Sequence, residues 1–248
     1  MTMSRWTSST PLGDPLAVEV LHAAAAAPQF SWARDWHILW RDDAWWLRAA
    51  GRPADLPQGQ VLTIGGAAQS MAIRLQAEDH RVQVDLLPNG DSHALVRVRS
   101  LGPASGARAR SLVLAASLSE QAFQPRALLA SDLRHLMLSA ESLECELMWQ
   151  RDAASAPALD HADRLHAAGG PRSLTTVVTR SDSAHDWLRA GQALVQCRSV
   201  AQDLGFAVHL GPHALGRRAT RESTRSLWQL SGWPQVQLSL VTQQDPDV

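Results

Sequence analysis

Residues 183–210 read SAHDWLRAGQALVQCRSVAQDLGFAVHL, and this stretch says more about the fold than any other part of the chain. Its apolar residues follow a helical pattern from Ala184 to Leu204. Gly205 comes next, in the position where a left-handed cap ends a helix. A short apolar run follows, as is typical of a strand. The sequence therefore predicts one long amphipathic helix that leads directly into a strand.

On both sides of this stretch, helical and strand-like patterns alternate. Asp14 and Pro15 mark the start of a helix that Pro28 stops. Asp42-Asp43 separates two short Trp-rich strands, and Pro88–Asp91 is a strong turn signal. The expected strands are 37–41, 44–48, 81–87, 93–99, 144–150, 173–179 and 236–241, and the further helices are 14–27, 61–77, 131–140 and 220–230.

Length and charge limit the classes of protein to which the chain can belong. With 248 residues and 45% hydrophobic content, it can bury a core and fits one large domain or two closely packed halves. The net charge of -1 provides no overall attraction toward nucleic acid or an anionic membrane. We therefore expect neither nucleic acid nor membrane as a partner.

The basic residues exclude several mechanisms. All 23 are arginines, and the chain contains neither Lys nor Tyr. A Lys Schiff base, a P-loop lysine and a Tyr general acid are therefore ruled out. A GC-rich genome accounts for this composition.

Cysteine usage and hydropathy indicate the compartment. Cys145 and Cys197 lie far apart in the sequence, and Cys197 falls inside the expected long helix, so they do not form a disulfide framework. The Ala-rich run 16–28 is interrupted by Glu19 and is too short to span a membrane. We expect a cytoplasmic, soluble protein.

Two segments of the chain repeat each other weakly. Gly66 begins a Gly-x-Ala helix that leads into the strand at Val82, and Gly191 begins a second one that leads into the strand at Ala207, at an offset of 125 residues. Either convergence on one helix-to-strand pattern or an internal duplication explains this likeness. Residues 102–110 have the composition of a linker between the two segments.

The Trp187–Leu194 spelling W-L-R-A-G-x-A-L, the long helix, the Gly and the strand together resemble the last helical unit of the nitroreductase family of flavoproteins. More narrowly, it is similar to the two-part, Acg-like branch of that family. The resemblance implies an α+β sandwich, with a mainly antiparallel sheet flanked by helices. It also implies an internal pseudo-dimer of two halves, which we place at 1–101 and 102–248.

Both flavin signatures of that family are altered here. Where the family spells A-P-S-x-H-N-x-Q-P-W, residues 27–36 keep only the Ala, the Pro and the last Trp. Where it spells R-R-x-x-R-x-F, residues 117–125 keep Phe123 and have no Arg. Each lost charge-assisted bond to the FMN phosphate removes about 1.5–3 kcal/mol. We therefore expect weakened binding of FMN.

The resemblance still indicates which residues would approach a flavin, and arginines at the start of the last expected helix could replace the lost phosphate contacts. The alternative interpretation of these arginines is a solvated basic helix start. The candidate residues are Trp32, Arg34 and Trp36 around the ring and Arg217, Arg218 and Arg221, followed by Arg225, toward the phosphate.

Other candidate sites have less support. His209 and His213 are separated by Gly211-Pro212 and have no third ligand nearby, and His161 and His166 make no better metal site, so we expect no metal. Cys197 lies among apolar helix positions, which favours an inert buried thiol.

Two hypotheses about function follow. The first is a nitroreductase-like protein with an altered flavin site and weak or lost NAD(P)H:FMN oxidoreductase activity, whose partners are a flavin or another small planar ligand. The second is a cofactor-free pseudoenzyme that acts as a ligand-sequestering or protein-interaction module. In either case the chain would be a monomeric pseudo-dimer or a homodimer.

Overall fold

A computed structural model describes residues 15–30, 35–103, 128–150, 172–210 and 214–241. Contacts divide the chain into two compact units: unit 1 holds residues 1–114 with 183–195, and unit 2 holds 115–182 with 196–248. The predicted halves 1–101 and 102–248 follow the order of elements along the chain. The contacts instead assign 183–195 to the first unit.

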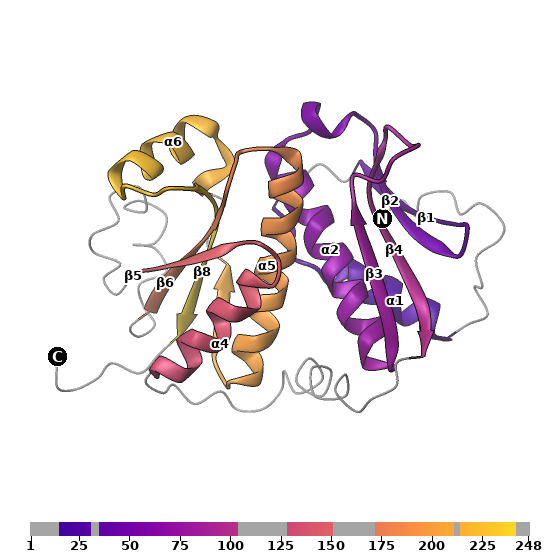
Figure 1. Cartoon of the computed structure of the whole chain (residues 1–248), viewed down its shortest axis with the longest axis horizontal. Helices are drawn as coiled ribbons and strands as arrows, with labels where there is room; N and C mark the ends of the chain where they lie inside the picture. The colour runs from indigo at the N-terminus through magenta and orange to yellow at the C-terminus, as the bar shows by residue number, and fades with distance from the viewer. Residues whose placement is uncertain (1–14, 31–34, 104–127, 151–171, 211–213, 242–248) are drawn as a thin grey trace. The chain divides into compact units, whose positions relative to one another are not determined.

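Unit 1 contains one four-stranded antiparallel sheet, in the order β1-β2-β4-β3 (Figure 1). Its two other long elements are helices, and the first part of α5 (Ala184–Asp203) completes it. The elements in chain order are α1 (Pro15–Ala25), β1 (Trp36–Arg41), β2 (Ala44–Ala49), the short 3-10 helix η1 (Pro53–Asp55), α2 (Gln58–Ala77), β3 (His80–Leu86) and β4 (Ala94–Pro103).

The β1–β2 hairpin follows from its two turn residues. Asp42 and Asp43 have positive φ angles of 53° and 54°. A two-residue turn with both central residues in the left-handed region matches the twist of the strands it joins, and Asp tolerates that conformation. The predicted hairpin around this pair is confirmed, with Trp40 opposite Trp45 across the ladder.

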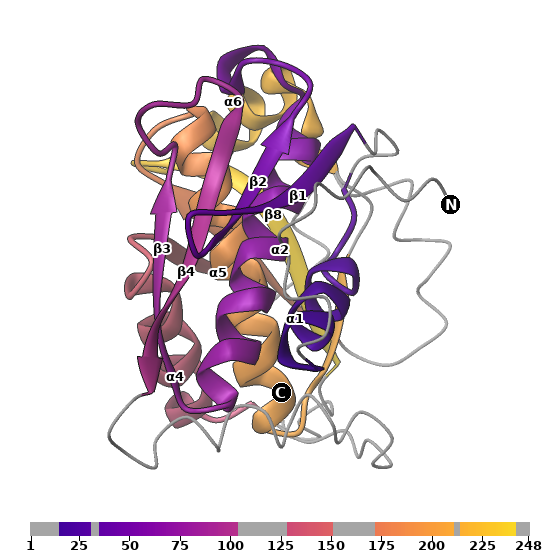
Figure 2. The ribbon, with the colours of Figure 1, turned by 90° about the vertical axis from the view of Figure 1, so that its right-hand side faces the viewer.

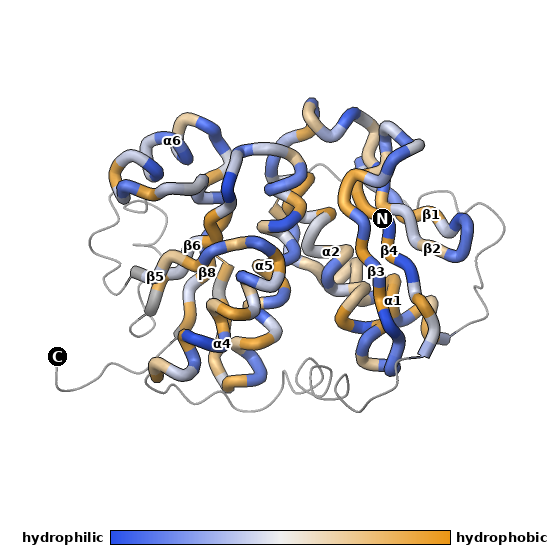
Figure 3. The backbone as a smooth tube through the Cα atoms, viewed as in Figure 1, coloured by the Kyte–Doolittle hydropathy of each residue, from blue (hydrophilic) through white to orange (hydrophobic). Residues whose placement is uncertain are grey.

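One face of this sheet carries the core of unit 1. Helices α1 and α2 lie on that face, as Figure 2 shows. Residues 81–86 of β3 and 96–99 of β4 alternate between polar and apolar (Figure 3). This alternation places every second side chain against the helices. The buried strand residues on this face include Trp45, Leu47, Ala49, Val96 and Val98.

Helix α2 is buried on all sides along its first part, where residues 58–69 are all buried. A helix buried all round needs neighbours on every side. The first part of α5 supplies one of them within unit 1, since Leu188 belongs to the same core cluster. At this contact, a Cβ on Gly65 would lie less than 3.0 Å from the Leu188 carbonyl, so the backbones approach as closely as glycine allows.

The contact between α2 and α5 is reciprocal. A Cβ on Gly191 would lie less than 3.0 Å from the Leu62 carbonyl. Leu62 and Leu188 are 126 positions apart, as are Gly65 and Gly191, and the two 20-residue helices also start and end 126 positions apart. Equivalent positions of α2 and α5 are therefore 126 residues apart in the sequence. Aligning Gly66 with Gly191 implies a separation of 125 residues instead.

Unit 2 contains a second four-stranded antiparallel sheet, in the order β5-β6-β8-β7. Its strands β6 and β8 are buried on both faces wherever their side chains are described, apart from positions near the strand ends. The remaining part of α5 belongs to this unit. The other elements are α4 (Ala130–Glu141), β5 (Glu146–Gln150), β6 (Arg172–Thr179), β7 (Ala207–Leu210), the 3-10 helix η4 (Ala214–Gly216), α6 (Arg218–Leu227) and β8 (Trp233–Val241).

The predicted α+β class is confirmed, with the strands in two sheets of four. All the predicted strands and helices occur, with shifted ends. The largest shift is in β4, which continues through Pro103 into the expected linker because its last residue pairs with His80 of β3. Of the helices in the described ranges, none is both long and apolar enough to cross a bilayer.

Candidate functional site

The arginines predicted to hold a phosphate lie at the start of α6 in unit 2. The helix has the polar sequence RATRESTRSL, and its N-cap residue is Arg217, in an extended conformation (φ −96°, ψ 134°). The side chain of Arg217 makes no capping hydrogen bond. An uncapped, basic helix start is the arrangement that attracts an anion, so the partners of each arginine decide what the cluster does.

Arg221 points into the protein and forms a buried ion pair with Asp182. Its Nε lies 3.0 Å from Asp182 Oδ1 and its Nη2 lies 2.9 Å from Oδ2, so two parallel bonds join the groups. Its Nη1 donates to the Leu215 carbonyl of η4 at 2.8 Å. The side chains of Arg221 and Asp182 are only 3% and 5% exposed. A planar guanidinium matched to a carboxylate in this way is a strong and directional pair.

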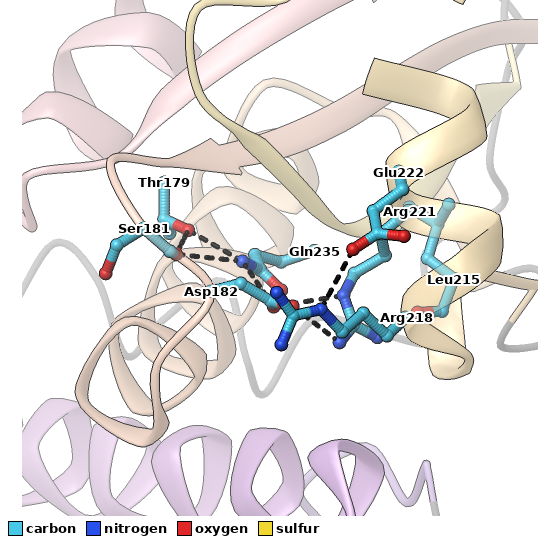
Figure 4. A network of polar contacts seen from close by, with 8 residues as sticks. All are labelled: Thr179, Ser181, Asp182, Leu215, Arg218, Arg221, Glu222 and Gln235. Carbon is cyan, nitrogen blue, oxygen red and sulfur yellow. Dashed lines mark hydrogen bonds and ion pairs between the residues drawn. The ribbon is translucent and has the colours of Figure 1, made fainter. Parts of the chain in front are cut away.

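A buried amide extends this pair toward the end of β6 (Figure 4). Gln235 Nε2 donates to Thr179 Oγ1 at 2.8 Å and to the Ser181 carbonyl at 3.2 Å, and it also lies 3.5 Å from Asp182 Oδ1. The Thr179 hydroxyl in turn donates to the Ser181 carbonyl at 2.9 Å. The network therefore joins α6, η4, the β6–α5 connection and β8 in one part of unit 2.

Two further arginines of the cluster lie over the ring of Trp233. The guanidinium carbons of Arg218 and Arg225 are 5.6 Å and 5.0 Å from its centroid, within the range of a cation–π contact. Arg218 also forms an exposed ion pair with Glu222 at 2.9 Å. Arg225 donates to the Leu230 and Ser231 carbonyls beyond the end of α6. Both arginines therefore have structural partners.

These contacts limit what the cluster can do chemically. Arg221 uses each of its three nitrogens on buried protein acceptors, so binding a phosphate would leave Asp182 as an unpaired buried charge. Breaking a buried pair in this way costs about 3–5 kcal/mol. Arg217 is exposed. An anion at this helix start would meet Arg217 and Arg218 and, in this arrangement, not Arg221.

The residues predicted to surround a flavin ring belong to another part of the chain. Trp36 is the first residue of β1 in unit 1, pairs with Ala49 and packs against the core. Trp32 and Arg34 lie outside the described residues, as does the segment 117–125 that aligns with the second signature. The assignment of Trp32, Arg34, Trp36, Arg217, Arg218 and Arg221 to a flavin site stays a prediction.

The thiol of Cys197 is deeply buried in unit 2. Its Sγ lies 3.5 Å from the Ser139 hydroxyl and 3.9 Å from the Leu136 carbonyl, both on α4. Burial raises the pKa of this thiol to about 11, although the contact with Ser139 opposes the shift. Because the thiolate is the nucleophile, a thiol with so high a pKa is inert near neutral pH. Cys145 is also buried, and both cysteines are free.

Metal ligands do not gather in the described part of the chain, where no group of three His, Cys, Asp or Glu side chains is arranged to hold an ion. His213, His161 and His166 fall outside that part.

Sequence reasoning missed the two residues that determine the role of Arg221. Asp182 lies 39 positions before it and Gln235 lies 14 positions after it, so no local motif joins them. The one available signal is the polar run Ser181-Asp182-Ser183 directly before a long helix, which fits a helix start. In the structure, Ser183 does bond to Asp186 in this way, while Asp182 bonds to Arg221.

No family model and no curated protein matches this sequence.

Proposed function

We propose that this chain is a cofactor-free protein-interaction module built on an internally duplicated α-β-β-α-β-β unit. The observation that carries the proposal is that Arg221 is hydrogen-bonded to Asp182 and to the Leu215 carbonyl, and that Asp182 is also in contact with the buried Gln235. The segment 117–125, which the family resemblance aligns with the phosphate signature, contains no arginine. Arg221, the buried arginine proposed to replace that signature, is bonded to the protein's own groups instead.

Element order and register support the duplication. Among the described elements, each half runs helix, two strands, long helix, two strands, except that η4 and α6 are inserted between the last two strands of the second half. The two sheets have the same relative strand order. The reciprocal contacts of Gly65 and Gly191 have the form of an isologous interface, in which residue i contacts j and j contacts i. A gene duplication that fused the two copies of a homodimer would leave this pattern.

Exposed apolar side chains support the binding of a protein. Among the described residues, seven large hydrophobic side chains are exposed, and four of the seven lie on α4, at its N-cap or on β5. Methionines suit adaptable binding surfaces because their side chains are flexible and polarisable. The four residues are Leu129, Met137, Leu138 and Met148.

The flavin hypothesis is a separate proposal that rests on the family resemblance alone. If it is right, Arg217 and Arg218 hold the phosphate, and the residues near Trp36 contact the ring. In that case FMN would supply hydride transfer between NAD(P)H and an electrophilic acceptor, while the protein would bind and orient it.

Equilibrium dialysis of the full chain against FMN, with the visible spectrum of the freshly purified protein, tests the proposal. We expect a colourless protein and no saturable binding up to about 1 mM FMN, where the standard free energy of binding would be about −4 kcal/mol. A flavin spectrum, or micromolar binding that is lost on Arg217→Ala and Arg218→Ala substitution, would overturn it.

A further inference from the structure

Among the described strands, β5 lies at an edge of the sheet of unit 2. This strand pairs only with β6 among the described strands, and the ladder runs without a register shift from Glu146 opposite Val178 to Gln150 opposite Leu174. An edge strand presents a row of unpaired backbone N–H and C=O groups, which can pair with another extended chain. The β5 edge (residues 146–150) is therefore a template for an additional strand.

Proteins usually block such edges, and the other three edges of the two sheets carry blocking features. Strand β3 has a register shift near His80 and carries Arg81 and Asp85. Strand β7 is only four residues long, and β1 ends in the charged Arg41. Short strands, bulges and charged side chains all discourage edge pairing.

Strand β5 has few of these features. Its sequence ELMWQ contains no Pro, Lys or Arg, and its single charge is at the first residue. Met148, in the middle of the strand, is 37% exposed, and Leu147 and Trp149 are half-buried. An exposed apolar side chain on an open edge provides a contact for the side chains of an added strand.

Negative charge surrounds the start of this edge. Glu141 ends α4 and Glu146 begins β5; both are exposed, and neither forms an ion pair with another described residue. Backbone bonds from Leu143 and Cys145 to the Ala140 carbonyl hold the end of the helix beside the start of the strand. A bound segment would therefore meet carboxylates at one end and apolar side chains farther along.

We propose that the β5 edge binds an extended segment of a partner protein, which adds to the sheet as a fifth strand and places basic residues opposite Glu141 and Glu146. The backbone groups of β5 supply the affinity, and Met148 with the two carboxylates supplies the selectivity. This inference rests on the proposed protein-interaction function and names the surface and the kind of partner.

The test uses the full chain and a random twelve-residue peptide library displayed on phage. We expect enrichment of peptides that alternate β-branched or aromatic residues with polar ones and carry Arg or Lys near one end. A labelled copy of the most enriched peptide is then titrated by fluorescence anisotropy. On binding, amides in residues 146–150 should gain protection in hydrogen exchange.

Three variants locate the contact. Met148→Lys introduces a charge of the kind that blocks edges, and Glu146→Arg reverses the charge at its start. Each should raise the Kd of the enriched peptide at least tenfold. Gln83→Lys, on the exposed β3 edge of unit 1, is the matched control and should leave the Kd unchanged.

The β5 proposal is overturned if no peptide is enriched, or if the Kd of the enriched peptide is unchanged in both the Met148→Lys and the Glu146→Arg variants. It is also overturned if protection appears only outside 146–150. Peptide binding at another surface would leave the protein-interaction function standing, whereas micromolar FMN binding would remove that function whatever the peptides do.

Discussion

Gly65 and Gly191 each lie against the backbone of the other's helix, Gly65 at the carbonyl of Leu188 and Gly191 at the carbonyl of Leu62. Two side-chain-free positions allow α2 and the first part of α5 to touch through their backbones in unit 1. Contacts between Cα–H groups and carbonyl oxygens are typical of such close helix pairs. The crossing is therefore a point where the sequence tolerates no added carbon atom.

Replacing either glycine by alanine should destabilise the protein. The new methyl group cannot move away from a backbone carbonyl, so the helices must separate, and overpacking of this kind costs about 1–3 kcal/mol. This loss outweighs the gain of about 1 kcal/mol in helix propensity. Urea denaturation of Gly65→Ala and Gly191→Ala, with two-state analysis, measures the change in the free energy of unfolding.

Gly66→Ala is the matched control for the crossing. Its Cβ would lie 3.2 Å from the Val195 Cγ2 methyl group and 3.5 Å from the Gly191 carbonyl, and a side chain can yield where a backbone cannot. We expect little change or a small stabilisation. In the Gly65→Ala/Gly191→Ala double variant, the second substitution should cost less than it does alone, because the first has already separated the helices. Additive costs would contradict a shared contact.

The Arg221–Asp182 pair should be essential for the stability of unit 2. Arg221→Gln or Asp182→Asn leaves a buried charge without its partner, which costs about 3–5 kcal/mol. Replacing both with apolar residues, as in Arg221→Met/Asp182→Leu, should recover much of that loss. Arg218→Gln is the control, since its ion pair is exposed and contributes at most about 1 kcal/mol. If Arg221→Gln proves as mild as Arg218→Gln, the pair does not have this structural role.

The Cys197 thiol should make stability depend on pH in the alkaline range. Burial raises its pKa from 9.0 to about 11, so between these values the folded state keeps a proton that the unfolded state releases. Its contribution to stability is present below pH 9 and is lost as the pH rises toward 11, at up to about 1.4 kcal/mol per pH unit. The stability advantage of the wild type over Cys197→Ala should therefore shrink from pH 9 to 11. A constant difference would contradict a buried neutral thiol.

His37 should make the hairpin of unit 1 sensitive to acid. Partial burial first and the nearby Arg48 second lower the pKa of its imidazole, while Asp91 acts in the opposite direction. A lowered pKa means that the neutral form is favoured in the folded state, so this contribution is present above pH 6.5 and is lost as the pH falls below it. An NMR titration should give His37 a pKa below 6.5, and His37→Gln should lose less stability on acidification than the wild type.

Local chemistry predicted much of the fold, and long-range pairing determined the rest. The Asp42-Asp43 hairpin and the Gly205 helix cap follow from backbone preferences of a few residues, and both occur, with Gly205 at φ 83°. The offset of 126 residues required the contact between Gly65 and Leu188, because the Gly-x-Ala pattern at Gly191 matches both Gly65 and Gly66. Whether Arg221 can bind a phosphate depends on the direction of its side chain, which its bonds to Asp182 determine. That pairing follows from the packing of β6, α5 and α6 and not from neighbouring sequence.

Equilibrium dialysis against FMN, with Arg217→Ala/Arg218→Ala as the variant, tests the central claim most directly, namely that the arginines at the start of α6 hold no flavin phosphate and that the chain works without a cofactor. The account predicts no saturable binding up to about 1 mM FMN for wild type and variant alike. Micromolar binding by the wild type that the double variant loses would contradict it, because those arginines would then hold a flavin phosphate.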